Sequence, residues 1–263
     1  MTLKYLIGIA LGIPLMPIIY VQGKKIRKQV PKLTEAKGNG GNCYKENQKA
    51  VQVLFIGEST FAGVGVETHN EGFAGTFAKE LSNQINRSVY WKVYAKSGYT
   101  AESIYKKLIP KIEEKEVDLI IVGIGGNDAF QLTTPQKWDH DIDKLITDLQ
   151  LKFPEGVIVF TNMPPIKEFP AFTLPIKFII GNLVEILGEK LNKRVQSFQK
   201  TYYNNRVIRI NEWKGKISGY ETNEKLFSDG VHPSKLAYQI WAKEMVIFVL
   251  KNAEIIESLR LKE

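Results

Sequence analysis

The chain has 263 residues, of which 44% are hydrophobic and 24% are charged, as in an ordinary folded globular protein. This composition excludes a disordered chain and a collagen-like repeat, and the single cysteine, Cys43, excludes an intramolecular disulfide framework. The net charge of +8 is concentrated at one end. Residues 1–30 hold five basic and no acidic residues, so the rest of the chain carries 31 basic against 28 acidic residues. A body so nearly neutral lacks the basic surface typical of nucleic-acid binding, and we expect no nucleic-acid partner.

The N-terminal segment 5–21, YLIGIALGIPLMPIIYV, carries no charge. As a helix it would be about 26 Å long, slightly shorter than the hydrocarbon core of about 30 Å. Pro14 and Pro17 would kink it, which membrane helices tolerate. We therefore predict a single membrane-spanning helix, with residues 1–28 acting as an anchor with a basic flank.

The basic flank at residues 24–28, KKIRK, follows the apolar segment directly. The positive-inside rule keeps such a flank in the cytoplasm, and its charges suit anionic lipid headgroups. We expect a single-pass protein whose main domain lies in the cytoplasm. The alternatives are a body on the extracytoplasmic face, a cleaved secretory signal, for which no A-x-A-like site follows, and a buried core helix.

Residues 29–50 are rich in Gly, Asn and Lys without a hydrophobic period, which predicts a linker. Cys43 lies in this segment and is not expected to be reactive. Residues 51–263 are predicted to form one domain, because short β-branched runs alternate with segments of helical period. The predicted strands are 51–57, 88–95, 117–124, 156–162 and 206–211, and the predicted helices are 71–86, 100–115, 137–152, 176–200 and 234–251. This alternation favours a doubly wound α/β domain with a parallel sheet between helices.

Polar motifs follow three of the predicted strands, where parallel α/β folds bind ligands. The first is Gly57-Glu58-Ser59-Thr60, whose serine suits a nucleophile but also a helix N-cap. The others are Ser97-Gly98-Tyr99-Thr100 and Gly125-Gly126-Asn127-Asp128. A glycine N–H and an asparagine amide can both donate to a developing oxyanion, although each motif is also a plausible turn.

Asp229 and His232 lie in the sequence SDGVHP, before the last long predicted helix. A histidine there could deprotonate a serine while the nearby acid fixes its tautomer, and the alternative is a structural or surface histidine. His69 and His140 lie in polar surroundings and are expected on the solvated surface. No zinc-binding or phosphate-loop pattern is present in the sequence.

The order GES, SG, GGND and DGVHP between Val51 and Leu250 resembles the SGNH (GDSL-type) hydrolase family. The resemblance implies a flavodoxin-like three-layer α/β/α fold with a five-stranded parallel sheet, and ester hydrolysis that uses no metal or other cofactor. It also implies Ser59 as nucleophile, His232 as general base and acid, and Asp229 as the residue that orients His232. Ser59, Gly98 and Asn127 would form the oxyanion hole. Glu58 departs from the usual Asp by one methylene, which puts in doubt any contact that a shorter Asp makes.

The segment IKEFPAFTLPIKFIIGNLVEILG, residues 166–188, is more apolar than one face of a surface helix requires. It either covers the sheet and a neighbouring loop or forms a lip that holds an acyl chain or enters the bilayer. Candidate substrate-binding residues in it are Phe169, Phe172, Leu174 and Phe178. With the anchor, this favours hydrolysis of acyl esters of membrane lipids, such as lysophospholipids or monoacylglycerols. The alternatives are a carbohydrate or peptidoglycan O-deacetylase, an acyl-thioesterase and a non-catalytic, membrane-tethered binding protein.

Overall fold

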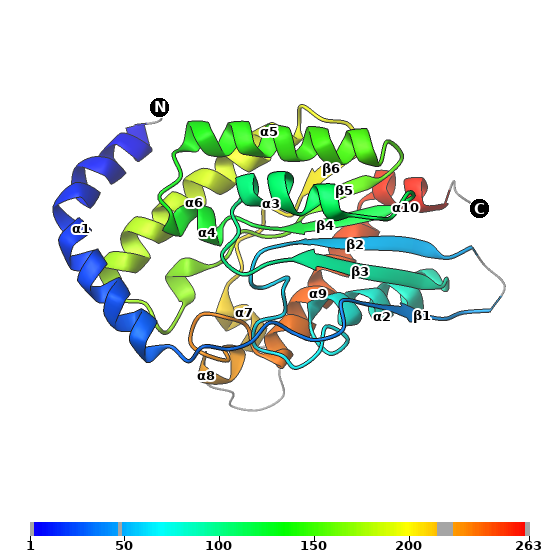
Figure 1. Cartoon of the computed structure of the whole chain (residues 1–263), viewed down its shortest axis with the longest axis horizontal. Coiled ribbons are helices and arrows are strands. Elements are labelled where there is room, and N and C mark those ends of the chain that lie inside the picture. Colours follow the sequence, from blue (N-terminus) through cyan, green and yellow to red (C-terminus); the bar gives the residue numbers. More distant parts are fainter. Residues whose placement is uncertain (1–2, 47–48, 215–222, 261–263) are drawn as a thin grey trace.

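The structure of the chain, a computed structural model, describes residues 3–46, 49–214 and 223–260 and has three layers, with a sheet between two groups of helices (Figure 1). The sheet has six strands in the order β1-β3-β2-β4-β5-β6. The strands are β1 (Gly40–Cys43), β2 (Val51–Gly57), β3 (Val89–Ala95), β4 (Leu119–Gly123), β5 (Val157–Phe160) and β6 (Thr201–Tyr203). Neighbours among β2 to β6 are parallel, whereas β1 is antiparallel to β3. The expected five-stranded parallel sheet is therefore a six-stranded mixed sheet.

The additional strand comes from the segment predicted as a linker. β1 pairs with β3 from Gly40 opposite Lys92 to Cys43 opposite Val89, and Ala36 N–H donates to the Ala62 carbonyl. β1 is an edge strand with mostly exposed side chains, so its contacts are made by the backbone and leave no hydrophobic period in the sequence.

The last strand differs from its predicted position. The segment 206–211 was expected to be a strand, but β6 is at Thr201–Tyr203 and pairs with β5 from Ile158 opposite Thr201. Ile208 lies in a loop and Ile210 begins a short helix, and both are buried outside the sheet, so their apolar character reflects packing against the core rather than pairing in the sheet. The helix expected over 100–115 ends at Lys107, because Pro110 lacks a backbone N–H for a continuing helix.

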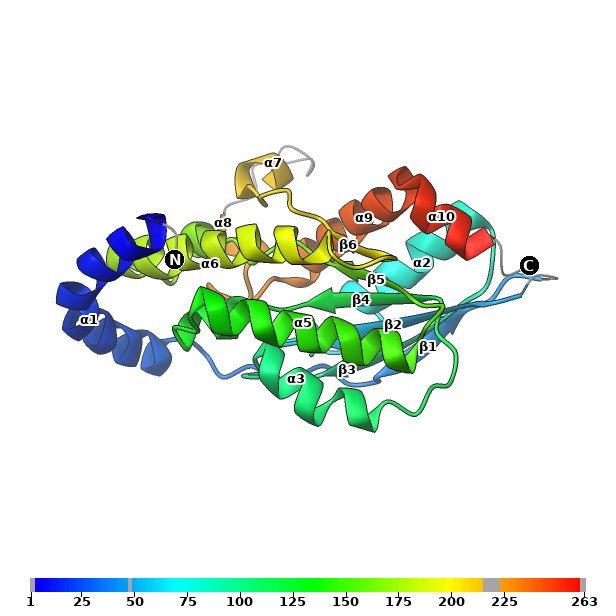
Figure 2. The ribbon, with the colours of Figure 1, turned by 90° about the horizontal axis from the view of Figure 1, so that it is seen from above.

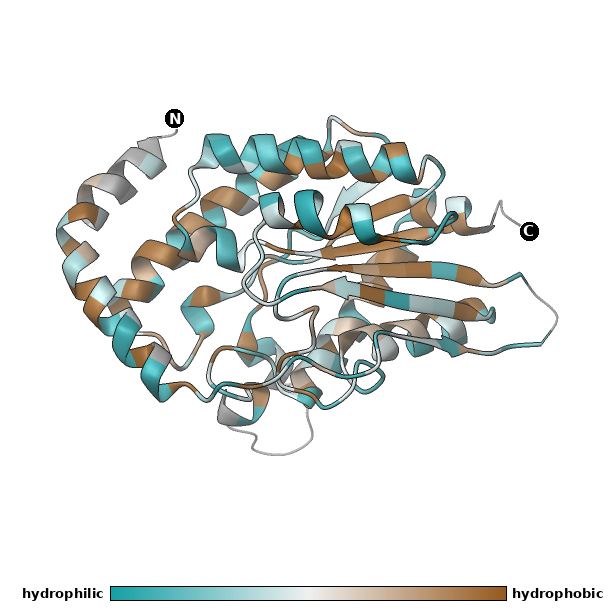
Figure 3. Cartoon of the chain, in the orientation of Figure 1, coloured by the Kyte–Doolittle hydropathy of each residue, from teal (hydrophilic) through white to brown (hydrophobic). Residues whose placement is uncertain are grey.

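The helices cover both faces of the sheet, as Figures 1 and 2 show. One face carries α2 (Phe73–Ile85) and α9 (Lys235–Lys251), and the other carries α3 (Ala101–Lys107), α5 (Pro135–Lys152) and α6 (Leu174–Val195). The short helices are α4 (Gly126–Phe130), α7 (Ile210–Lys214), α8 (Asn223–Leu226) and α10 (Ala253–Arg260), and 3-10 turns lie at Ile109–Lys111 and Ile166–Glu168. Figure 3 shows the hydrophobic residues concentrated in the central strands, and every residue of β4 and β5 is buried. Burial on both faces explains why these strands read as unbroken apolar runs.

The N-terminal apolar segment forms helix α1 (Leu3–Gln29), which lies along α6 (Figures 1 and 2). Thr173 donates a 2.6 Å hydrogen bond to the side-chain oxygen of Gln22, and Ile179 packs at Gly12. The apolar excess of α6 is explained by this packing, because it contacts the body on one side and α1 on another. Within the described residues, no helix is both long and apolar enough to cross a bilayer, so the predicted membrane-spanning helix is not supported.

Candidate active site

Ser59 follows β2 and begins a series of turns, and the next helix, α2, starts only at Phe73. Hydrogen bonds to β4 on one side and to α9 on the other fix these turns. The Glu58 N–H donates to the Gly123 carbonyl of β4, and the Tyr238 hydroxyl of α9 donates to the Val64 carbonyl at 2.8 Å. Ser59 therefore lies half-buried at the carboxyl edge of the sheet, and it does not cap a helix.

His232 lies between Ser59 and Asp229. Its Nε2 is 3.1 Å from the Ser59 Oγ, and its Nδ1 is 2.7 Å from Asp229 Oδ2. The other carboxylate oxygen, Oδ1, accepts the backbone N–H groups of Val231 and His232 at 2.9 and 2.7 Å. Burial raises the pKa of Asp229, but the hydrogen bonds from His232 and Val231 outweigh it and hold the pKa below its usual value. An ionised Asp229 therefore fixes the imidazole with Nε2 facing a hydroxyl, which is the arrangement of a serine nucleophile and its base.

Gly98 and Asn127 follow β3 and β4, the two strands that flank β2, so the parallel sheet brings both residues beside Ser59. Gly98 has a φ of +83°, and a Cβ there would meet no atom within 4 Å. Glycine is needed at this position for its backbone conformation rather than for space. The Asn127 Nδ2 donates to the Tyr99 carbonyl at 3.0 Å, which orients the amide. The second N–H of that amide remains to donate to an oxyanion.

Glu58 connects the turn that carries Ser59 with the turn that carries Asn127. Its two carboxylate oxygens accept the backbone N–H groups of Gly126 and Asn127, each at 2.8 Å. Burial raises the pKa of Glu58 to about 7, against the lowering effect of these two hydrogen bonds, and Asp128 raises it further. The longer side chain of Glu58 therefore reaches the neighbouring strand end and uses both oxygens there.

Two further acids support the site and were not predicted as site residues. Glu35, in the segment expected to be a linker, accepts the Ser97 backbone N–H at 2.8 Å and the Lys96 ammonium at 2.9 Å. Asp128 is buried and accepts the Ala101 N–H at 3.1 Å, and burial raises its pKa to about 7. Asp128 lies within the GGND motif, whereas no local pattern indicates Glu35, whose partners are 61 and 62 residues away.

The other polar predictions have mixed outcomes. His69 was expected on the surface but is buried, because its ring packs near Gly63 and its backbone N–H donates to the Lys37 carbonyl. Burial lowers the pKa of His69, which favours the neutral ring. His140 is exposed as expected. Burial raises the pKa of the Cys43 thiol, which disfavours the reactive thiolate.

The four candidate substrate-binding residues fall into two groups. Phe169 is buried, and Phe172 packs on it with ring centres 5.5 Å apart. Leu174 and Phe178 are 82% and 47% exposed at the start of α6. The structure therefore brings only Phe169 and Phe172 together.

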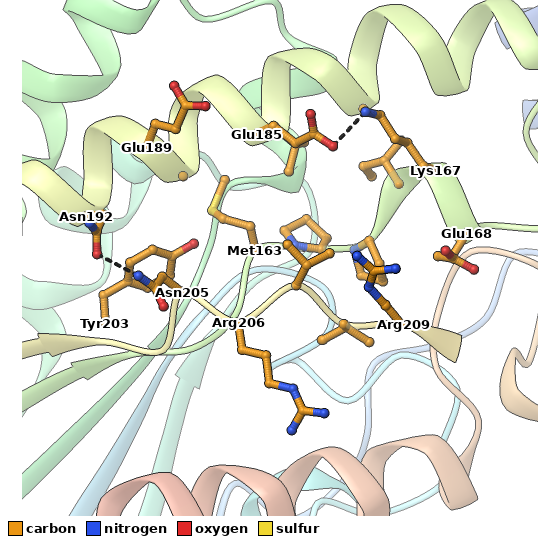
Figure 4. A pocket seen from close by; sticks show the side chains of 18 residues that line it. Met163, Lys167, Glu168, Glu185, Glu189, Asn192, Tyr203, Asn205, Arg206 and Arg209 are labelled. Atoms are coloured by element: carbon orange, nitrogen blue, oxygen red, sulfur yellow. Dashed lines mark hydrogen bonds and ion pairs between the residues drawn. The ribbon is translucent and has the colours of Figure 1, made fainter. Parts of the chain in front are cut away.

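Among the cavities that the described residues line, two neighbouring ones lie at the carboxyl ends of the strands. A narrow apolar cavity of about 40 Å³ includes Glu58, Thr60 and Phe169 in its lining. A larger cavity of about 540 Å³ lies between α6, the segment after β5 and the segment after β6 (Figure 4). The two cavities share lining residues, namely Pro164, Pro165 and Ile208.

The fold and the hydrogen-bonded serine, histidine and aspartate define the class as a carboxylic ester hydrolase. The chain belongs to the GDSL-like Lipase/Acylhydrolase family, whose sequence pattern matches residues 55–240. Comparison with curated protein sequences gave no match.

Solved structures of similar fold include TesA, with 19% sequence identity, a TM-score of 0.55, and coverage of 76% of this chain and 98% of TesA. Phospholipase A1 from Streptomyces albidoflavus NA297 is 15% identical, with a TM-score of 0.53. The match covers 76% of this chain and 99% of the phospholipase. A carbohydrate esterase family 2 enzyme from Corynascus thermopiles (Myceliophthora fergusii) is 13% identical, with a TM-score of 0.57. The match covers 82% of this chain and 69% of the esterase. At these identities the likeness concerns the fold.

Proposed function

We propose that Ser59 is the nucleophile of an esterase that forms an acyl-enzyme, with His232 as general base and acid and Asp229 as its orienting carboxylate. The observation that carries this proposal is the pair of contacts that His232 makes, 3.1 Å to Ser59 Oγ and 2.7 Å to Asp229. All three side chains needed for serine ester hydrolysis are thus in hydrogen-bond contact.

In the first half-reaction, the Ser59 proton moves to His232 Nε2 while Oγ attacks the ester carbonyl carbon. The carbonyl oxygen becomes an oxyanion, which the Ser59 and Gly98 backbone N–H groups and the Asn127 amide stabilise. The intermediate collapses as the carbon–oxygen bond to the leaving alcohol breaks, and the His232 proton passes to that alcohol. Water, deprotonated by His232, then attacks the acyl-enzyme and releases the acid and Ser59.

The proposed substrates are acyl esters of membrane lipids, of lysophospholipid or monoacylglycerol type. The apolar pair Phe169 and Phe172 supports an acyl substrate, as does the likeness of the fold to a phospholipase A1 and to lipases. Membrane association would use residues 5–21 and the basic flank 24–28, where Ile13 and Val21 are exposed beside Lys24 and Lys25. The catalytic domain would then lie in the cytoplasm, with the extracytoplasmic face as the alternative.

A carbohydrate O-deacetylase is the second candidate, because carbohydrate esterases of families 2 and 3 share the fold. An acyl-thioesterase would use the same chemistry on a thioester. A non-catalytic tethered binding protein is disfavoured by the presence of Ser59, Asn127, Asp229 and His232 together.

The test is hydrolysis of p-nitrophenyl esters from acetyl to palmitoyl by the full-length protein and by Ser59→Ala. We expect activity on medium or long acyl chains that the substitution abolishes. Activity confined to acetyl esters would contradict the lipid substrate and favour O-deacetylation. Equal activity in both proteins would contradict the role of Ser59.

A further inference from the structure

An apolar groove lies between α1 and α6, near the end of α4 and apart from the two cavities described above (Figure 1). Its volume is about 200 Å³. The α6 wall includes Ile179, Leu183 and Ile186, and the α1 wall includes Gly8 and Met16. Among the described residues, no charged side chain lines the groove. It therefore fits an apolar ligand, because a charged group would lose its hydration there without a partner.

The glycines of α1 explain where the two helices touch and where they leave a gap. Gly8 and Gly12 are four residues apart, which places them on the same face of α1. At Gly12, a Cβ would lie 3.5 Å from the Ile179 side chain, in ordinary contact with α6. At Gly8, a Cβ would meet no described atom within 4 Å. The groove at Gly8 is therefore open space that the side chains of the described residues do not fill.

Leu132, which lines the groove just after α4, has a strained backbone conformation. Its φ of +54° lies in the left-handed region, which a bulky side chain rarely adopts and which glycine adopts without strain. Its side chain is 39% exposed, so core packing does not account for a leucine at this position. Strain of this kind is typical of ligand sites. An apolar wall of the groove gives a reason for the leucine.

A row of phenylalanines connects the surroundings of Ser59 with this groove. Phe169 lines the narrow cavity described above, and Phe172 packs on it. Phe130 of α4 packs on Phe172 with ring centres 5.3 Å apart, and 43% of its side chain is exposed. Phe130 lies three residues after Asn127, so the two are neighbours on one face of α4. An apolar chain that begins at a carbonyl held by the Asn127 amide can therefore pass Phe130 and reach the groove.

We propose that the groove between α1 and α6 binds the far end of the substrate's acyl chain, with Phe130 and Leu132 in contact with the chain on its way from Ser59. This inference rests on the proposed esterase function and names the substrates as long-chain acyl esters. The family pattern matches residues 55–240, so the groove depends on a helix outside the matched region. In this proposal α1 contributes directly to the choice of substrate.

The separation of the two sites determines which chains can reach the groove. At about 1.5 Å per helical residue, Leu132 lies about 8 Å beyond Asn127. A zigzag chain with bonds of about 1.5 Å advances about 1.3 Å per carbon, so about six carbons reach Leu132. Acetyl and butyryl chains are too short. Each further methylene that enters the groove should raise kcat/KM about fourfold, since its burial contributes about 0.8 kcal/mol.

The first experiment measures hydrolysis of p-nitrophenyl esters from acetyl to palmitoyl by full-length wild type, Gly8→Phe and Gly23→Phe. A phenylalanine at position 8 would occupy the groove. We expect its kcat/KM for decanoyl and longer esters, relative to the butyryl ester, to fall about tenfold or more, since two or more methylenes lose their site. Gly23 lies on α1 outside the groove, and a Cβ there meets no described atom within 4 Å, so Gly23→Phe is the matched control and should keep the wild-type profile.

The second experiment replaces Leu132 with Gly and measures both the chain-length profile and thermal unfolding. Glycine adopts a φ of +54° without strain, so the melting temperature should not fall. The relative kcat/KM for decanoyl and longer esters should fall about fourfold or more, because apolar contact with the chain is lost. A lower melting temperature with an unchanged profile would show that Leu132 only packs within the protein, and would overturn its place in the groove.

A binding measurement separates this inference from the proposed function. Full-length Ser59→Ala is titrated with monodecanoylglycerol in a calorimeter, and we expect Gly8→Phe, but not Gly23→Phe, to weaken binding about tenfold or more. Hydrolysis and binding of long-chain esters that are unaffected by Gly8→Phe would overturn the groove and leave the esterase. Binding that depends on Gly8, in a protein whose wild type hydrolyses no ester, would overturn the esterase and leave the groove as a site for an apolar chain.

Discussion

The backbone N–H of Asn127 donates a 2.8 Å hydrogen bond to Glu58 Oε2, although the two residues are 69 positions apart. Gly126 makes the equivalent bond to the other oxygen of the same carboxylate. Glu58 thereby joins the end of β2, which carries Ser59, to the first turn of α4, which carries the Asn127 amide. Glu58 therefore helps to fix the distance between Ser59 and Asn127, the proposed nucleophile and the proposed oxyanion donor, and we expect it to act as a positioning residue.

Replacing Glu58 with Gln should therefore reduce turnover without changing substrate affinity. The substituted side chain would retain one acceptor oxygen and set its NH₂ group against a backbone N–H, so α4 would shift. We expect kcat on a p-nitrophenyl ester to fall about tenfold with little change in KM, as for a donor that is displaced rather than removed. Glu58→Asp, which keeps the charge, should have an intermediate effect. If Glu58→Gln had wild-type turnover, the position of the α4 turn would not depend on the two hydrogen bonds to the Glu58 carboxylate.

Removing the Asn127 amide should have a larger effect on catalysis and a small one on stability. Loss of one oxyanion donor lowers kcat by about a hundredfold to a thousandfold. In the folded protein, Asn127→Ala loses the hydrogen bond to the Tyr99 carbonyl, which contributes about 1 kcal/mol. Steady-state kinetics together with thermal unfolding would separate the two effects. A large drop in melting temperature would mean that the amide is mainly structural.

Replacing Glu35 tests whether the segment before β1 contributes to catalysis. Its carboxylate accepts the Ser97 N–H beside Gly98, so Glu35→Ala should loosen the turn that presents the Gly98 N–H. We expect kcat to fall about fivefold to tenfold, within the energy of one charge-assisted hydrogen bond. Glu116→Ala, which removes an exposed acid elsewhere, serves as the control. If both variants hydrolyse esters equally fast, the segment contributes only to packing.

Asp128 should make stability depend on pH. Burial raises its pKa in the folded protein to about 7, above the unfolded value near 4. Its favourable contribution is thus fully present below the unfolded pKa and is lost as the pH rises through about 7. The substituted amide has no carboxyl group to titrate, so Asp128→Asn removes this loss of stability at higher pH while it keeps an acceptor for the Ala101 N–H. Between about pH 5 and about pH 8, the free energy of unfolding of the variant should therefore gain up to about 3 kcal/mol relative to wild type. Urea denaturation at both pH values measures this, and parallel pH profiles for the two proteins would contradict it.

Much of the fold could be predicted because it depends on local patterns. The strands β2 to β5 appear as apolar runs because both faces of the sheet are covered, and α2, α5, α6 and α9 appear through their helical period. The polar motifs that follow β2, β3 and β4 could be located in the same way, because parallel strands end at one edge. Ser59, Gly98 and Asn127 could be singled out as candidates in this way, whereas Asp229 and His232 were singled out by their spacing before the last long helix, and the roles of all five came from the resemblance to the SGNH family.

Only the tertiary structure decided the features that depend on contacts between distant backbone groups. β1 becomes a strand because β3 offers it an edge, Glu35 reaches Ser97 from the expected linker, and Glu58 reaches the α4 turn. His69 is buried by packing that its polar neighbours do not indicate, and α1 lies along α6. The periodicity of a sequence reports how its side chains divide between core and solvent. It carries no information on which remote N–H or carboxylate a residue meets, and those contacts hold this site together.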